Sequence, residues 1–431
     1  MAKDTAKALA NNTIYQVYHR NFSQEGTFKE VEKHLDRLVD LGIDSVYLLP
    51  IHPIGEIARK GSLGSPYSIA DFYAVNPELG TLDDLRFLID SAHEKGLTVM
   101  LDIVFNHTSK DHPWLLKHPE FYYRNPQGDF SNRVGDWSDI TDLDYTYRPL
   151  WDVMHDILVY WADFGFDGFR CDVASFLPID FWIEARKKIA SIKPGFVWLA
   201  ESVHKEFVRD MRRQGFPCLS DSEIFQAFDV AYDYDIFQEL EDYFQGKRPL
   251  SAYIDRLQLQ EMIYPDNYLK ARTYENHDVA RLMKQTKGSI AKTKNWVAVI
   301  FMLKGVAFLN GGIETLTDRL PNLFEKDPID WTKIDSEWVN QLKRLIALKK
   351  HAIFSAYDFY DVFDHQDDVM HIEYKKDGET LVAICNVGQI QKAIPVSLKD
   401  GIYINQFNQK RIPVKNNMIS CDVDPIIIHH C

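Results

Sequence analysis

The sequence predicts an α/β fold: a (β/α)8 barrel with a small domain inserted after the third strand and an antiparallel β-sandwich domain at the C-terminus. Two observations lead to this fold class. Short apolar runs alternate with longer segments of helical spacing as far as residue 350, which is the pattern of parallel βα units. Beyond residue 351 the apolar runs are short and separated by tight turns, which is typical of an antiparallel β domain.

Eight apolar runs are expected to form the strands of the barrel. They span residues 14–18, 45–49, 98–104, 168–172, 196–200, about 227–230, 270–274 and 306–309. A barrel of this type typically occupies about 250 residues. The longer stretch found here therefore requires insertions.

Two helices illustrate how the intervening segments are recognised. The apolar positions between Val31 and Val39 form one stripe, so a helix there is expected to face the core along that stripe. Residues 81–95 have a helical pattern that begins with Thr81 and Asp84, the spacing of a capping box.

The longest interruption of the βα pattern lies between the third strand and the helix near Trp151. It contains Pro, Gly, Asn and aromatic residues without helical periodicity, so a small inserted subdomain is expected. In the C-terminal region, residues 369–374 and 380–386 flank Lys-Lys-Asp-Gly, which is a hairpin signature. The predicted domains are barrel 1–106, insertion 107–150, barrel 151–351 and C-terminal β domain 352–431.

Composition excludes several classes of partner. The chain has 431 residues, is 45% hydrophobic and 26% charged, as in ordinary soluble domains. Its net charge of −14 disfavours nucleic acid, whose binding depends on basic side chains. The longest apolar run, residues 296–303, is far shorter than the roughly 20 residues that span a bilayer. No membrane partner is expected, and the oligomeric state is left open.

Two features predict a cytoplasmic protein. The first ten residues lack the apolar stretch of a secretory signal. The five cysteines lack metal-ligand spacing and suit reduced thiols better than a disulfide framework. They are Cys171, Cys218, Cys385, Cys421 and Cys431.

Polar side chains gather at the carboxyl ends of four predicted strands, where barrels of this type carry their active sites. The strand ends read Asp102-Ile-Val-Phe-Asn-His107, Gly168-Phe-Arg-Cys-Asp172, Trp198-Leu-Ala-Glu201 and Tyr274-Glu-Asn-His-Asp278. The carboxylates of Asp172, Glu201 and Asp278 are therefore expected to converge. Arg170 lies two residues before Asp172 on the same strand face, where its charge favours an ionised carboxylate. Glycosidic cleavage needs one ionised and one protonated carboxyl group, and Asp172 and Glu201 can divide these roles.

These four segments resemble the ordered sequence blocks of the α-amylase superfamily of retaining glycoside hydrolases and transglycosidases. The similarity covers residues 13 to about 350 and includes Ser65-Pro-Tyr-Ser-Ile-Ala-Asp71. The resemblance implies Asp172 as the nucleophile, Glu201 as the general acid/base and Asp278 as the carboxylate that stabilises the transition state.

The resemblance also implies a set of substrate-binding residues. Arg170 would hold Asp172, His107 and His277 would bond to sugar hydroxyls, and Tyr67 would stack on the sugar ring. Aromatic residues of the insertion, such as Trp137, either stack on sugars or form the core of the subdomain.

No organic cofactor is expected, and a calcium ion is one interpretation of Asn106 and Asp142. Both offer oxygen ligands for a hard cation, yet the same oxygens also suit a hydrogen-bonded loop anchor. Where many calcium-dependent relatives continue to a Lys-His pair, this chain has Ser175-Phe176. Val173 leaves the choice between α-1,4 and α-1,6 linkages open.

The leading hypothesis is retaining hydrolysis of α-glucosidic bonds in short α-glucans, such as maltodextrins derived from starch. An alternative is a glucanotransferase, isomerase or phosphorylase, in which another acceptor replaces water. A third is a carbohydrate-binding protein without activity, whose usual mark is the loss of a catalytic acid. Retention requires the Asp172 and Glu201 carboxyl groups to lie about 5 to 5.5 Å apart.

Overall fold

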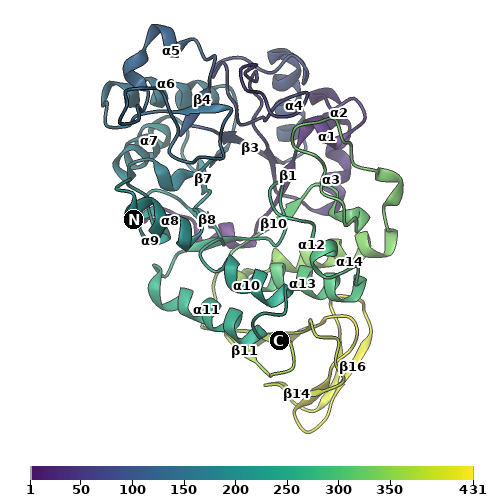
Figure 1. Cartoon of the computed structure of the whole chain (residues 1–431). Helices are drawn as coiled ribbons and strands as arrows, with labels where there is room; N and C mark the ends of the chain where they lie inside the picture. The colour runs from purple at the N-terminus through teal and green to yellow at the C-terminus, as the bar shows by residue number, and fades with distance from the viewer. Residues whose placement is uncertain (1, 431) are drawn as a thin grey trace.

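The computed structural model describes residues 2–430 and confirms the predicted closed barrel and C-terminal antiparallel domain (Figure 1). Eight parallel strands close in the order β1-β10-β9-β8-β7-β6-β3-β2. Their bounds are β1 Thr13–Val17, β2 Ser45–Leu48, β3 Thr98–Ile103, β6 Gly168–Cys171, β7 Val197–Ala200, β8 Val230–Tyr232, β9 Leu269–Arg272 and β10 Val306–Asn310. All eight are buried, except for Thr98 and Val197 at two strand starts, as expected for parallel strands covered by helices.

Helices surround this ring. The α-helices are α1 His19–Phe22, α2 Phe28–Lys33, α3 Leu35–Leu41, α4 Leu82–Glu94, α6 Pro149–Asp163, α7 Ile179–Ile192, α8 Lys205–Arg213, α9 Asp221–Ile224, α10 Phe237–Phe244, α11 Leu250–Ile263, α12 Leu282–Gln285, α13 Ile290–Met302 and α14 Ser336–Lys349. Short 3-10 turns are η1 Lys7–Asn11, η3 Ala174–Phe176, η4 Ile313–Thr315, η5 Trp331–Lys333 and η6 Ala352–Phe354. Thr81 and Asp84 form the predicted capping box at the start of α4.

Two local predictions need correction. The expected single helix through residues 31–39 is divided at His34 into α2 and α3, and Val39 is 41% exposed. The sixth strand, predicted near residues 227–230, is shifted to Val230–Tyr232. The physical reason is α9, whose Ser220–Glu223 capping box starts a helix that continues in turns as far as Phe228.

The segment between β3 and α6 forms a small layer over the barrel mouth. It contains the antiparallel pair β4 His107–Ser109 and β5 Ile140–Asp142, with α5 Trp114–Lys117 and η2 Pro119–Phe121 between them. The register pairs His107 with Asp142. This pairing brings the end of the insertion back to the end of β3.

The C-terminal domain is built on a four-stranded antiparallel sheet in the order β11-β12-β13-β18, with the ribbons β14-β17 and β15-β16. The bounds are β11 Phe359–Asp364, β12 Val369–Lys376, β13 Glu379–Asn386, β14 Ala393–Pro395, β15 Gly401–Ile404, β16 Arg411–Val414, β17 Met418–Ser420 and β18 Ile426–His430. The predicted hairpin is β12 and β13, which turn at Asp377 and Gly378. Cys431 lies outside the described residues.

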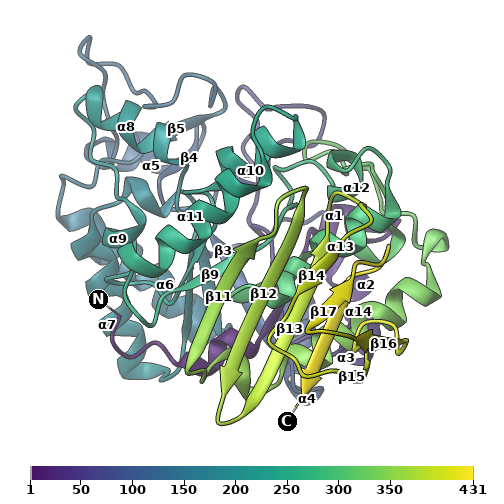
Figure 2. The same ribbon diagram turned by 90° about the horizontal axis from the view of Figure 1, so that it is seen from below.

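The sheet joins the barrel through one face. Met370, Ile372 and Leu381 belong to the same hydrophobic core as the barrel, whereas Val382 and Ile384 pack with the two ribbons. Figure 2 shows the sheet lying beside α11 and α13.

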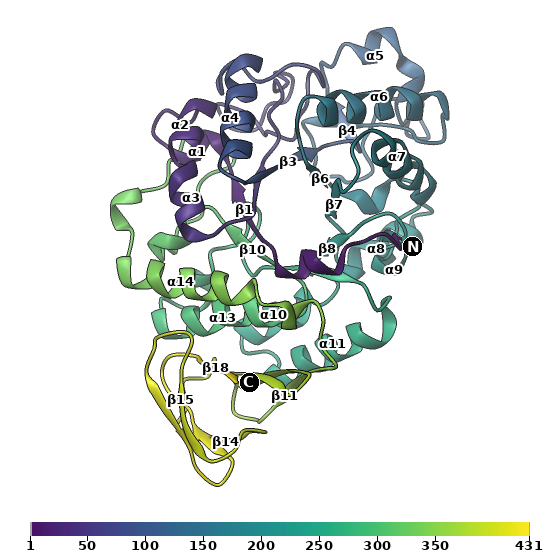
Figure 3. The ribbon, with the colours of Figure 1, turned by 180° about the vertical axis from the view of Figure 1, so that it is seen from behind.

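The opposite end of the barrel is seen in Figure 3, where the N-terminal segment passes β8 and β10. Within residues 2–430, no helix has both the length and the apolar character needed to cross a membrane.

Candidate active site

The three predicted carboxylates come together at the carboxyl ends of β6, β7 and β9. Asp172, Glu201 and Asp278 all line one cavity of about 280 Å³. Arg170 lies beneath them, with Nη1 2.9 Å from Asp172 Oδ1 and Nη2 3.1 Å from Glu201 Oε2. One guanidinium therefore contacts two of the three acids directly.

Arg170 is fixed from below by Asp102. The Asp102 side chain is fully buried and accepts a hydrogen bond of 2.9 Å from Arg170 Nη1. It also accepts hydrogen bonds from the hydroxyls of Tyr47 and Tyr67. Asp102 thus acts as a structural acid that orients the guanidinium.

The environment of Asp172 opposes the ionisation of its carboxyl group. Burial and the nearby Glu201 carboxylate raise the pKa of Asp172, and Arg170 opposes this rise. One guanidinium contacts the carboxylates of Asp102, Asp172 and Glu201. A negative charge on Glu201 therefore disfavours one on Asp172.

Asp278 differs from the other two acids because its side chain is 50% exposed. Its Oδ2 lies 3.0 Å from His277 Nε2. Burial acts to raise the pKa of Asp278, but its contacts with His277 and the charge of Arg170 outweigh burial and lower it. Asp278 is thus a carboxylate that stays ionised at the edge of the cavity.

Tyr67 and His107 line the cavity, whereas the predicted His277 does not line it and instead stacks on Tyr67. The Tyr67 hydroxyl lies 2.6 Å from His277 Nε2, and the two rings stack with centroids 5.3 Å apart. His107 Nε2 lies 3.2 Å from the Tyr67 carbonyl oxygen. Burial lowers the pKa of His107 to about 4, so its imidazole is neutral near pH 7 and suited to hydrogen bonding.

A second cavity, of about 610 Å³, adjoins the first. Both are lined by Trp137, Val173, Glu201 and Asp278, whereas Asp172 lines only the smaller one. The larger cavity is rich in aromatic side chains: Trp137, Phe207, Tyr234, Phe237 and Phe244. Glu201 therefore stands at the junction, and Asp172 faces one side only.

Sequence reasoning missed two residues that position the site. Val173 has a left-handed backbone, with φ 34° and ψ 46°, which is strained for a β-branched residue. Its N–H donates to Glu201 Oε2 at 2.8 Å. Gln16 Nε2 lies 2.8 Å from His277 Nδ1 and so helps to orient that ring. Neither role has a sequence signal, because both depend on contacts between distant strands.

Asn106 and Asp142 lie together, but their surroundings do not fit a calcium ion. Asn106 Nδ2 donates to Asp142 Oδ1 at 3.1 Å. The other oxygen, Oδ2, accepts from the Arg133 backbone N–H at 2.8 Å and from its guanidinium at 3.2 Å. Burial raises the pKa of Asp142 to about 6, against the pull of Arg133. A fixed positive charge therefore already lies next to the Asp142 carboxylate. Asn106 and Asp142 fit a hydrogen-bonded anchor of the loop and do not fit a pair of calcium ligands.

Two family models match the chain. The model for the alpha amylase catalytic domain matches residues 10–133, and the model for the bacterial alpha amylase C-terminal domain matches residues 362–428. An alpha-amylase from Lactobacillus plantarum is 41% identical, with a TM-score of 0.95 over 99% of this chain and 100% of that one. A noncanonic maltogenic alpha-amylase from Thermotoga neapolitana is 30% identical, with a TM-score of 0.86 over 98% and 99%.

Curated relatives add a second activity class. An alpha-1,4-glucan:maltose-1-phosphate maltosyltransferase from Burkholderia pseudomallei is 34% identical over 213 residues, which are 44% of this chain and 19% of the relative. The chain spans between 19% and 39% of the length of the first four such relatives. The barrel, the C-terminal domain and the near full-length match to solved alpha-amylases agree: this chain belongs to the α-amylase family of enzymes.

Proposed function

We propose that the enzyme hydrolyses α-glucosidic bonds of short α-glucans by double displacement, with net retention of configuration. The observation that carries the proposal is the position of the two acids relative to the two cavities. Asp172 faces only the smaller cavity, and Glu201 stands where the cavities meet. A nucleophile must reach the anomeric carbon on one side of the bond, while the acid must reach the oxygen between the two sugars.

The first step forms a covalent intermediate. Asp172 attacks the anomeric carbon of a sugar in the smaller cavity, and Glu201 gives its proton to the departing oxygen. The bond between the anomeric carbon and that oxygen breaks, and the leaving saccharide occupies the larger cavity. Asp278 stabilises the positive charge that develops on the sugar ring, while Arg170 holds the attacking oxygen of Asp172.

The second step reverses the roles. Glu201, now ionised, takes a proton from water, and the water oxygen attacks the anomeric carbon. Asp172 leaves as a carboxylate, so two inversions give net retention. Tyr67 and His107, which line the smaller cavity, and His277, which stacks on Tyr67, are proposed to bind the sugar by hydrogen bonds and ring contact.

The smaller cavity suggests how much of the glucan lies on the side of the nucleophile. Lys60 pairs with Asp139 at 3.0 Å, and both residues line this cavity beside Leu323 and Phe324. Sugars on this side continue toward the non-reducing end of the glucan. We therefore propose cleavage near the non-reducing end, supported by the smaller volume on this side, about 280 Å³ against about 610 Å³ on the other.

The proposed reaction needs no organic cofactor. It also needs no calcium, since Arg133 already pairs with Asp142 where a calcium ligand was considered. An α-glucan oligosaccharide is the proposed partner. A cytoplasmic location is also proposed. Its support is the state of four cysteines, which are buried free thiols, as in a reducing compartment: Cys171, Cys218, Cys385 and Cys421.

Product analysis tests the proposal. The enzyme is incubated with maltotriose, isomaltose, sucrose and trehalose, which separates the linkages, and the first product is examined for its anomeric form. We expect α-configured product from an α-linked glucan. Inversion would refute the role of Asp172, and glucan binding without turnover would make the chain a carbohydrate-binding protein.

Glycosyl transfer is the second candidate function. The larger cavity is favoured for a saccharide acceptor because aromatic side chains pack well on sugar faces. Maltosyltransferases among the relatives point the same way. Labelled maltose, added as acceptor with an unlabelled maltodextrin donor or with maltose-1-phosphate, measures this activity. Labelled longer products in excess of hydrolysis would favour a transferase, and phosphate-dependent release of a sugar phosphate would favour a phosphorylase.

A further inference from the structure

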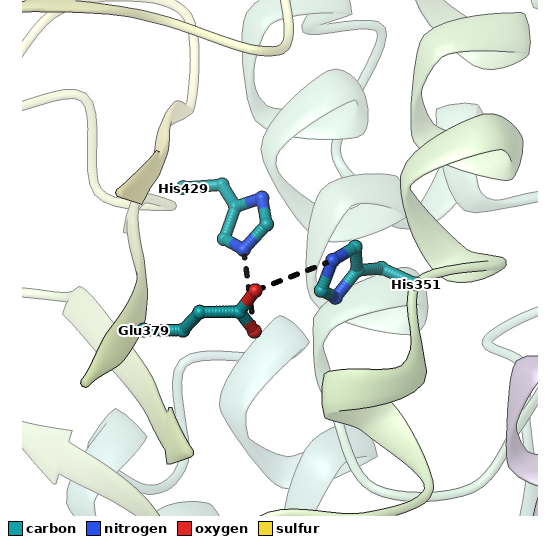
Figure 4. A group of neighbouring side chains, drawn as sticks. All are labelled: His351, Glu379 and His429. Carbon is teal, nitrogen blue, oxygen red and sulfur yellow. Dashed lines mark ion pairs between the residues drawn. The ribbon is translucent and has the colours of Figure 1, made fainter. Parts of the chain in front are cut away.

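Three metal-ligating side chains meet at the seam between the barrel and the C-terminal domain (Figure 4). His351 follows α14, Glu379 begins β13, and His429 lies near the end of β18. His351 Nε2 is 3.8 Å from Glu379 Oε1, and His429 Nε2 is 3.9 Å from Glu379 Oε2. One ligand atom from each residue lies within 4.8 Å of the other two. We refer to these three residues as the seam triad.

The fold fixes the orientation of the seam triad. Leu381 pairs with His429 across β13 and β18, so Glu379, two residues before Leu381, lies on the same face of the sheet. The backbone of His351 is held by Asn11, whose side-chain amide donates to the carbonyl oxygen of His351 at 2.5 Å. The three ligands thus come from three anchored segments.

The separations suit a small divalent cation. In a tetrahedral zinc site, bonds of about 2.0–2.1 Å place neighbouring ligand atoms roughly 3.4 Å apart. The two ion pairs measure 3.8 and 3.9 Å but end on different oxygens of Glu379. With one ligand atom taken from each residue, the separations reach at most 4.8 Å, so side-chain rotations must bring the ligand atoms up to about 1.4 Å closer. Two imidazoles and one carboxylate match zinc rather than calcium, which prefers a shell of oxygen ligands.

Each histidine has a ring nitrogen that a metal could take. Among the described residues, His429 Nε2 is a buried nitrogen without a hydrogen-bond partner, and its ion pair with Glu379 at 3.9 Å is longer than a hydrogen bond. His351 Nδ1 lies 3.3 Å from the Ile353 N–H. This long contact is given up when Nδ1 takes the ring proton and Nε2 binds the metal.

We propose that the seam triad binds a zinc ion through His351, Glu379 and His429, with water as the fourth ligand. Three protein ligands with one open position is a known zinc geometry. The ion would link the segment after the last barrel helix to two strands of the C-terminal sheet. Its expected role is to stabilise this junction, since the triad takes no part in either active-site cavity.

Titration of the full-length chain with zinc tests the proposal, after any purification tag and bound metal have been removed. We expect one zinc ion per chain, and cobalt bound in its place should give the visible absorption of a tetrahedral site. His351→Asn, Glu379→Gln and His429→Asn should each weaken binding at least about tenfold. Zinc at a hundredfold excess over its dissociation constant should raise the melting temperature by a few degrees.

The exposed His118–Glu120 pair is a matched control. It has a His nitrogen 3.3 Å from a carboxylate oxygen, and within residues 2–430 it belongs to no group of three metal-ligating side chains. His118→Asn should leave the zinc affinity unchanged. Absence of stoichiometric binding, or equal losses in the control and the triad variants, would overturn the proposal. Circular dichroism of each triad variant checks that a loss of binding does not reflect unfolding.

Discussion

The barrel mouth and the seam with the C-terminal domain differ in the side chains that face their carboxylates. At the mouth, Arg170 lies against Asp102, Asp172 and Glu201, and Arg133 lies against Asp142. At the seam, two imidazoles face one carboxylate. A guanidinium is always charged, whereas an imidazole gains charge only near pH 6.5 or below.

This difference separates two kinds of site. The mouth carries its own cations on fixed side chains, Arg170 and Arg133. The seam offers two imidazoles and a carboxylate as ligands for an ion taken from solution. We therefore propose that the mouth acts on a neutral sugar and that the seam accepts a cation.

The largest expected effect concerns the acid that Arg170 holds. Asp172→Asn should lower kcat on α-glucans by about 10⁴-fold or more, by analogy with removal of a nucleophile in other enzymes. Glu184→Gln, which removes one partner of an exposed ion pair with Arg148, is the control and should retain activity. Comparable rates in Asp172→Asn and wild type would show that the Asp172 carboxylate at the barrel mouth does not take part in the reaction.

Arg170→Met tests whether the mouth depends on its internal cation. The substitution leaves the fully buried Asp102 carboxylate without its ionic partner. Breaking a buried pair in this way typically costs about 3–5 kcal/mol of the free energy of unfolding. Denaturant titration measures the loss. A change below about 1 kcal/mol would mean that the three acids are stabilised mainly by other groups.

Imidazoles inside the barrel sharpen the comparison with those at the seam. His52 is buried beside Trp161, and burial lowers its pKa from 6.5 to about 4. The folded state therefore binds fewer protons than the unfolded state between these values. The stability contributed by neutral His52 is complete above pH 6.5 and is lost as the pH falls toward 4, by about 3 kcal/mol.

The variant His52→Asn isolates this effect. Free energies of unfolding measured between pH 7 and pH 4 should fall less steeply for the variant than for wild type, because asparagine does not titrate. An equal slope for both proteins would assign the acid sensitivity to other groups. His118→Asn, at an exposed histidine, should keep the wild-type slope.

The sequence predicted the parts of the site that follow from topology. Asp172 and Glu201 directly follow the parallel strands β6 and β7, and Asp278 lies in the segment after β9. The carboxyl ends of such strands must meet at one mouth. Arg170 was predictable from its spacing of two residues on one strand. The barrel itself was predictable because the alternation of apolar runs and helical segments repeats along the chain.

The other features of the two sites depend on tertiary contacts, which no local sequence pattern predicts. Arg133 reaches Asp142 because the segment before β5 folds back along that strand, where the Asp142 N–H donates to the Ser131 carbonyl oxygen. Val173 takes its left-handed backbone under tertiary constraint. The seam triad combines residues 351, 379 and 429, whose spacing resembles no metal motif. The shift of β8 has a local cause, since the capping box at Ser220 outweighs the apolar run that follows.

The smallest expected effect concerns the second internal cation. Arg133→Met removes the guanidinium contacts to Asp142 and to the carbonyl oxygen of Leu143. Hydrogen bonds of a charged group are worth roughly 1.5–3 kcal/mol, and Asp142 can take up a proton to limit the cost. We therefore expect a loss of about 2 kcal/mol in the free energy of unfolding.

Calcium and chelators then distinguish an internal cation from a metal site at the barrel mouth. Wild-type activity should be unchanged by a chelator, because the positive charge beside Asp142 belongs to the chain. In Arg133→Met the acid is exposed to solution ions, so calcium should recover part of the lost stability there and none in wild type. If a chelator inactivated the wild-type enzyme and calcium restored its activity, the role given to Arg133 would be contradicted. Zinc should not restore activity in that case, since zinc is expected to act only at the seam.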